Sequence, residues 1–222
     1  MEVMPPDSVI TISSGEYSTA GATVLARVTA DEYDPVTLDL LFDQAIDQAE
    51  AALLKAVACD NIGLDLRIWS REGRPSLNLS PKTLERLASL SSSFNFHPRV
   101  ISDDGREIDQ INAFGLLGLQ RRPELIVMLR GRPDGNGKFV NLSRVESHWY
   151  SPAGLQARIA EALAAGVSNV PGEVNRWEVY VDIDLHSDRG IWPGFFLPAP
   201  LIKALASYNA SLDFDPYIYP SV

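Results

Sequence analysis

Two hydrophobic periodicities alternate along the first half of the chain. Residues 8–13 and 22–30 are rich in β-branched residues and flank a glycine-bounded stretch, so they predict a β-hairpin. From Pro35 to about Val57, apolar residues recur three and four positions apart, which predicts an amphipathic helix that packs on a core. Residues 64–68 then alternate between apolar and polar, as a half-buried strand does.

A short strand, a second helix and a closing strand are predicted next. The short extended piece at residues 77–79 leads into Ser80 and Pro81, which are typical of a helix start. A strand then begins at Phe94. Residues 102–123 contain a turn, an apolar stretch and a final proline, so we expect a connector that packs between the two halves of the chain.

The same order of elements then begins again, with strands predicted at residues 124–129 and 138–142. Identical residues recur at one constant separation: Leu25/Leu142, Arg27/Arg144, Tyr33/Tyr150, Pro35/Pro152 and Asp65/Asp182. One added residue before Leu197 restores the match: Leu79/Leu197, Leu87/Leu205, Ser93/Ser211, Phe96/Phe214 and Pro98/Pro216. Unrelated sequences share roughly one residue in twenty, so the pattern indicates an internal duplication.

The predicted fold class is therefore α+β. Each copy is a hairpin, a helix, a strand, a helix and a strand, with mainly antiparallel sheets and helices on one face. We expect a first repeat at residues 1–101, a packed connector at 102–123 and a second repeat at 124–222, related by an approximate two-fold axis.

Composition narrows the range of functions. The chain has 222 residues and a net charge of −10, and residues 1–118 carry most of the negative charge. An acidic surface repels phosphates, which argues against nucleic-acid binding. The sequence lacks a membrane-spanning apolar run and a secretory signal, and it holds a single cysteine. These features predict a soluble cytoplasmic protein.

The first helix carries an acidic stripe opposite its apolar side. Asp39, Asp43, Asp47 and Glu50 recur three or four residues apart, so they share one face of the helix. The matched positions of the second copy are uncharged: Gln156, Ala160, Ala164 and Val167. The fold does not require the stripe, which is either a solubilising face or a docking surface for a basic protein partner.

Aromatic residues gather in the second copy instead. Most are expected in the core, but Trp192 and Phe195 lie in a Pro-Gly loop beside the one added residue. This loop is a candidate for an exposed contact with a partner.

Two pairs of aspartates are weak candidates for a metal or acid–base site. Asp182 and Asp184 alternate on one predicted strand, and Asp213 and Asp215 on another, so four carboxylates would converge if the strands were neighbours. The first copy argues against a shared site, because its matched residues are Asp65, Arg67, Asn95 and His97. No cofactor motif is present, and the stretch Gly131–Lys138 predicts a hairpin turn.

The closing part of each copy resembles a bacterial family, the domain-of-unknown-function family 4279. The resemblance is carried by Trp149, the helix after it, and the acidic final strand that ends at Tyr219. It implies no known activity and no catalytic residues. By analogy, small bacterial domains of this kind are often immunity proteins of toxin loci.

Two functions remain open at this point. The first is a non-enzymatic interaction protein, such as an immunity or inhibitor protein, that binds a basic toxin or effector through the acidic helix face. The alternative is a small-molecule or metal-dependent enzyme with a carboxylate-lined pocket between the repeats. The identity of the partner and the oligomeric state do not follow from the sequence.

Overall fold

The computed structural model describes residues 7–15, 22–31, 34–55, 61–70, 76–100, 125–133, 138–167, 177–187 and 194–218. The first half contains β1 (Ser8–Ser14), β2 (Thr23–Ala30), α1 (Pro35–Leu53), β3 (Ile62–Ser70), β4 (Leu77–Leu79), α2 (Pro81–Ser89) and β5 (Ser93–Val100). The second half contains β6 (Leu125–Pro133), β7 (Val140–Ser147), α3 (Pro152–Val167), β8 (Trp177–Ser187), β9 (Phe195–Leu197), α4 (Ala199–Ser207) and β10 (Ala210–Ile218). The two halves therefore present their elements in the same order.

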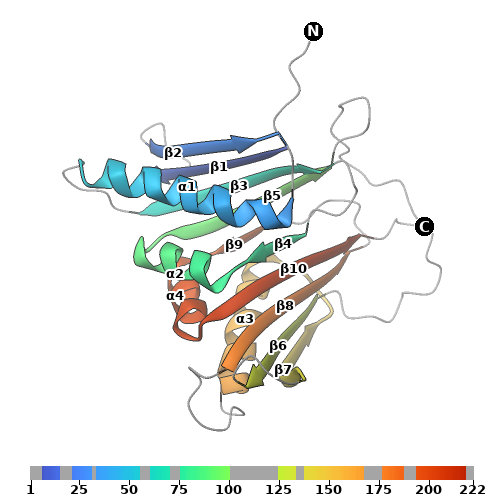
Figure 1. Cartoon of the computed structure of the whole chain (residues 1–222). Coiled ribbons are helices and arrows are strands. Elements are labelled where there is room, and N and C mark those ends of the chain that lie inside the picture. The colour runs from blue at the N-terminus through green and yellow to red at the C-terminus, as the bar shows by residue number, and fades with distance from the viewer. Residues whose placement is uncertain are drawn as a thin grey trace.

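The strands form two five-stranded sheets that exchange their short strands (Figure 1). The first sheet has the order β2-β1-β3-β5-β9, and the second has the order β7-β6-β8-β10-β4. Strand β9 pairs with β5 of the first half, and β4 pairs with β10 of the second half. Only the β3–β5 and β8–β10 pairs are parallel. Each half thus completes the sheet of the other.

Each sheet is covered by a helix on one face. Helix α1 lies in front of the first sheet in Figure 1, and α3 lies behind the second sheet. Helices α2 and α4 pack against each other near the middle of the molecule. We call the face of each sheet that points away from α1 or α3 its polar face, because its residues include Thr11, Asp65 and His97 in the first sheet and Tyr180, Asp182 and Asp213 in the second.

A cluster of phenylalanines joins the two halves at their centre. Phe195 on β9 lies between Phe96 and Phe214, with ring centroids 5.3 and 4.8 Å away. Phe96 and Phe214, which match in the two copies, also contact each other edge to face at 5.8 Å. All three are buried. Phe96 and Phe214 therefore pack against each other across the boundary between the halves.

Residues next to the second helix of each half determine where that helix begins and ends. The hydroxyl of Ser80 accepts a hydrogen bond from the Thr83 amide at 3.2 Å and caps α2. Pro198 holds the matching position before α4 and makes no side-chain cap. Two positions after the last residue of each helix stands a residue with positive φ, Ser91 (52°) or Asn209 (49°), and this left-handed residue turns the chain into the next strand.

The structure confirms the mixed α+β class, with four helices and ten strands among the described residues. Helix α1 ends at Leu53, before the expected Val57, and β6 and β7 extend further than the two strands predicted for the second hairpin. The predicted connector at residues 102–123 lies outside the described residues. The repeated order of elements agrees with a duplication, which itself stays a prediction, as do the repeat boundaries.

Candidate functional site

The acidic stripe of α1 faces α2, where one arginine gathers three of its carboxylates. The Arg86 guanidinium lies 3.0 Å from Asp43 Oδ1, 2.5 Å from Asp47 Oδ1 and 3.1 Å from Glu50 Oε2. Only 20% of the Arg86 side chain is exposed, whereas 69% of the Asp47 side chain is. The half-buried cation therefore holds the carboxylates in place while part of their surface still faces solvent.

The start of the stripe is held by the first turn of α2. The Thr83 hydroxyl donates a hydrogen bond to Asp39 Oδ1 at 2.8 Å, and Lys82 Nζ lies 2.5 Å from Asp43 Oδ2. Hydrogen bonds from Lys82 and Arg86 lower the pKa of Asp43, although burial acts in the opposite direction. The pKa of Arg86 is raised: burial lowers it, but the carboxylates of Asp47 and Asp43 more than offset that effect.

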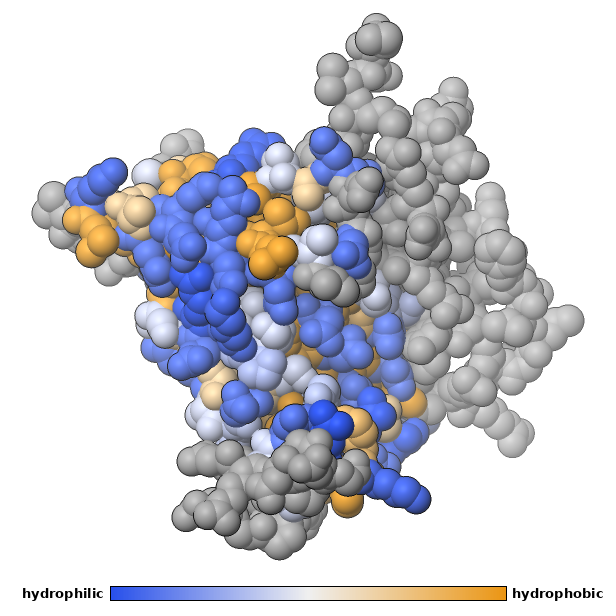
Figure 2. All heavy atoms as spheres, in the orientation of Figure 1, coloured by the Kyte–Doolittle hydropathy of each residue, from blue (hydrophilic) through white to orange (hydrophobic). Residues whose placement is uncertain are grey.

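These residues form one acidic surface on α1 and α2. We define it as Asp39, Asp43, Asp47, Glu50, Lys82, Glu85 and Arg86; five carboxylates against two cations leave a net charge of −3. Figure 2 shows a continuous hydrophilic area over these two helices. The sequence predicted the stripe but not its cations, which lie 36 to 43 positions further along the chain. The second half lacks these two cations, since Pro200 and Ala204 stand at the positions that match Lys82 and Arg86.

The aromatic loop does not provide the expected exposed contact at Phe195. This side chain is only 3% exposed and packs in the phenylalanine cluster, so its assignment to partner binding is wrong. Trp192 lies outside the described residues. Among the described aromatic residues, Trp149 is the most exposed, at 75%, and it lies in the segment between β7 and α3.

The four aspartates of the second half lie on neighbouring strands, as the metal hypothesis requires. In the parallel β8–β10 pair, Asp182 is opposite Asp213 and Asp184 is opposite Asp215. The carboxylate of Asp182, however, is taken by Arg130, whose Nε donates to Oδ2. Within the described ranges, no three side chains of the His, Cys, Asp or Glu type are grouped so that they could hold a metal ion.

Burial and mutual repulsion raise the pKa of two of these carboxylates. Burial, followed by the charges of Asp215 and Asp182, raises the pKa of Asp213 to about 6. Burial and the charge of Asp182 also raise the pKa of Asp184. Arg130 opposes both shifts but does not cancel them. This face therefore holds more negative charge than its cations neutralise.

Replacing Asp213 with asparagine is expected to stabilise the protein at pH 7 by about 1 kcal/mol, less than the full pKa shift implies because solvent screens the group. The folded protein holds a proton on Asp213 more tightly than the unfolded chain does, so stability falls as the pH rises from about 4 to about 6. Urea unfolding at several pH values should show this fall in the wild type and a flatter profile in Asp213→Asn. An unchanged profile would contradict this electrostatic assignment.

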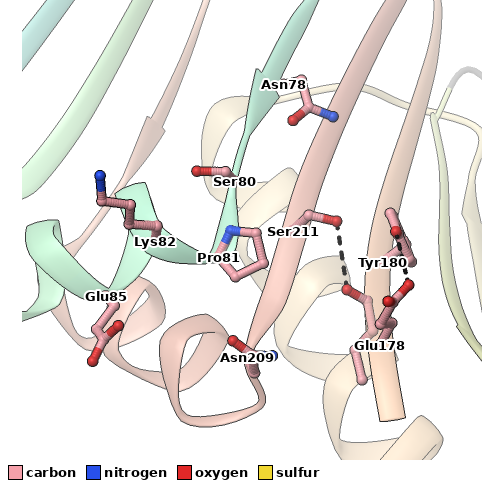
Figure 3. Close-up of a pocket in the computed structure, with 10 residues that line it drawn as sticks. Asn78, Ser80, Pro81, Lys82, Glu85, Glu178, Tyr180, Asn209 and Ser211 are labelled. Carbon is pink, nitrogen blue, oxygen red and sulfur yellow. Dashed lines mark hydrogen bonds between the residues drawn. The ribbon is translucent and has the colours of Figure 1, made fainter. Parts of the chain in front are cut away.

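A shallow pocket of about 580 Å³ lies between the two halves, on the polar face of the second sheet (Figure 3). Its lining residues come from β4 and α2 on one side and from β8 and β10 on the other: Asn78, Ser80, Pro81, Lys82, Glu85, Glu178, Val179, Tyr180, Asn209 and Ser211. The Tyr180 hydroxyl donates to Glu178 Oε2 at 3.3 Å. None of the four aspartates lines this pocket, so its carboxylates are Glu85 and Glu178 instead.

Comparison with known proteins adds no assignment. No protein-family model matches the chain, and neither the curated proteins nor the solved structures gave a significant match. In the part of the chain that the structure describes, no helix combines the length and apolar character needed to cross a membrane.

Proposed function

We propose that this chain is a non-enzymatic interaction protein whose acidic surface on α1 and α2 docks a basic protein partner. The supporting observation is the Arg86 network, which fixes Asp43, Asp47 and Glu50 before any partner arrives. Carboxylates that are already ordered lose little side-chain entropy on binding. The surplus negative charge would also speed encounter with a basic surface at low salt.

We infer a cytoplasmic protein that acts as an immunity or inhibitor protein against a basic toxin or effector, in line with the resemblance to domain-of-unknown-function family 4279. Under this proposal the chain needs no cofactor, because binding alone blocks the partner.

Charge reversal on the exposed edge of the acidic surface is expected to abolish this binding. The double variant Asp47→Lys and Glu50→Lys leaves Asp43 paired with Lys82 and places two new cations where the partner's positive charge would lie. The test is affinity capture from a lysate of the source cells, followed by quantitative mass spectrometry. The captured amount of a basic protein that the wild type binds should be at least tenfold lower with the variant. The captured amount should also fall as salt is raised.

The matched control reverses two exposed carboxylates elsewhere, Glu146→Lys and Glu161→Lys, and so changes the net charge equally. This control should retain the partner. Equal loss with both variants, or equal retention, would show that the acidic surface is not the docking site.

A second candidate function is the binding of a small polar molecule, as in the alternative of a pocket between the repeats. The observation that favours it is the pocket of about 580 Å³ to which both halves contribute. Its shallow shape and the engagement of Lys82 with Asp43 make it the weaker candidate.

A further inference from the structure

The pocket between the halves adjoins the acidic surface of α1 and α2. Two residues of α2, Lys82 and Glu85, belong to both. Figure 3 shows them on one side of the pocket, with Glu178 and Tyr180 of β8 on the other side. A protein that docks on the acidic surface would therefore lie beside the pocket, so that one of its side chains can enter it.

Three groups of the lining are able to accept a further hydrogen bond. On Glu178, the Arg132 guanidinium and the Tyr180 hydroxyl both donate to Oε2, and Oε1 receives no hydrogen bond from the described residues. The Ser211 side chain is only 6% exposed, and its hydroxyl donates one long hydrogen bond, 3.5 Å, to a backbone carbonyl. Within the same part of the chain, no cation pairs with the exposed carboxylate of Glu85. These acceptors suit a ligand that brings only donors.

The charge of the lining also favours a cation. Its carboxylates are Glu85 and Glu178 and its one cation is Lys82, so two negative charges against one positive charge leave −1. Lys82 Nζ is held 2.5 Å from Asp43 Oδ2, on the acidic surface. Arg132 offsets part of the charge of Glu178 but does not line the pocket. An anion would therefore be repelled here, and a cation attracted.

These carboxylates are particular to one place in the repeat. The position of the second half that matches Glu85 is Lys203, and the position of the first half that matches Glu178 is Asn61. One matched residue therefore has the opposite charge and the other has none. The shared order of elements does not require the acidic lining, just as it does not require the acidic stripe of α1.

We propose that the pocket receives a cationic side chain, a lysine or an arginine, of the basic protein partner that docks on the acidic surface. Its N–H groups would donate to Glu178 Oε1 and Ser211 Oγ, with Glu85 close to its charge. A side chain that fills a pocket within a wider contact is the usual form of an interface hot spot. This inference rests on the proposed docking function and extends its contact to the second half.

The first test is a titration of the full chain with N-acetylarginine amide, followed by the backbone amide NMR signals of Tyr180, Asn209 and Ser211. We expect saturable shifts at these pocket residues, with an affinity that falls as salt is raised. N-acetylcitrulline amide has nearly the same shape without the charge. It should bind roughly tenfold more weakly or less, because it lacks charge-assisted hydrogen bonds.

Neutralising the lining should weaken binding of the arginine probe. We expect Glu85→Gln with Glu178→Gln to lower its affinity roughly tenfold or more. The matched control, Glu146→Gln with Glu161→Gln, removes two carboxylates that also pair with arginines but do not line the pocket, and it should bind as the wild type does. Glu85→Lys, at an exposed position of α2, should abolish binding even if the substitution of Glu178 disturbs the fold.

The captured basic partner, once purified, separates this proposal from the docking function. Glu178→Gln leaves every residue of the acidic surface in place, whereas Asp47→Lys with Glu50→Lys leaves the pocket lining in place. Weaker binding of the partner by both variants supports the anchor. Retention of the partner by Glu178→Gln overturns the anchor while the docking function stands, even where the arginine probe binds. The anchor is also overturned if the arginine probe gives no saturable shift or binds no better than the citrulline probe.

Discussion

Replacing Phe195 with alanine is expected to lower the free energy of unfolding by about 3–5 kcal/mol. Its ring is buried and lies 5.9 Å from Phe94, 5.3 Å from Phe96 and 4.8 Å from Phe214, so truncation opens a cavity in the centre of the phenylalanine cluster. Because Phe195 belongs to the second half and Phe94 and Phe96 to the first, both halves should lose stability together.

Phe139→Ala is the matched control for this substitution. Phe139 also contacts an aromatic ring, Tyr180 at 5.0 Å, but it is 46% exposed, so we expect a loss below about 1 kcal/mol. Denaturant unfolding of the two variants should show one transition in each case, with a much lower midpoint for Phe195→Ala. A loss for Phe195→Ala that is no larger than the control would contradict a core role for β9.

The local elements of this fold were predictable because their signals are local. The first hairpin and helix follow from hydrophobic period, and the start of α2 follows from Ser80 and Pro81. The exchange of β4 and β9 was not predictable. Strand β4 is Leu-Asn-Leu and strand β9 is Phe-Phe-Leu, and in each the first and third residues are buried. So short a sequence does not indicate which strand lies alongside.

In the candidate site, too, the local pattern was predictable and the long-range contacts were not. Helical spacing correctly placed Asp39, Asp43, Asp47 and Glu50 on one face, but their pairing with Arg86 joins residues far apart in the sequence. Alternation correctly placed the aspartates of β8 and β10 on a shared face. It could not show that Arg130 of a third strand neutralises Asp182, which removes the main argument for a metal site.

The two halves differ most in the arrangement of their charged residues. The first half has an acidic surface with its own cations on α2, and the second half has neither. The second half pairs its buried aspartate with Arg130, whereas the first half leaves an oxygen of Asp65 without a partner. The two halves therefore present the same order of elements with different arrangements of charge.

The two halves are interlocked, because β4 completes the second sheet and β9 completes the first. Packing of α2 on α4 and the contact of Phe96 with Phe214 add to the same boundary. A break in the chain between β5 and β6 therefore removes a covalent link but none of these contacts. Separating the two fragments is expected to unfold both, because each then loses an edge strand and exposes a buried hydrophobic surface.

The most direct measurement is size-exclusion chromatography after cleavage at a protease site placed between β5 and β6. We expect the two fragments to elute together at the size of the intact chain, to separate only in denaturant, and to re-form the intact-sized complex when the denaturant is removed. Separately purified fragments should each lack cooperative unfolding. Elution of two independently folded fragments in native buffer would contradict the strand exchange and the shared core.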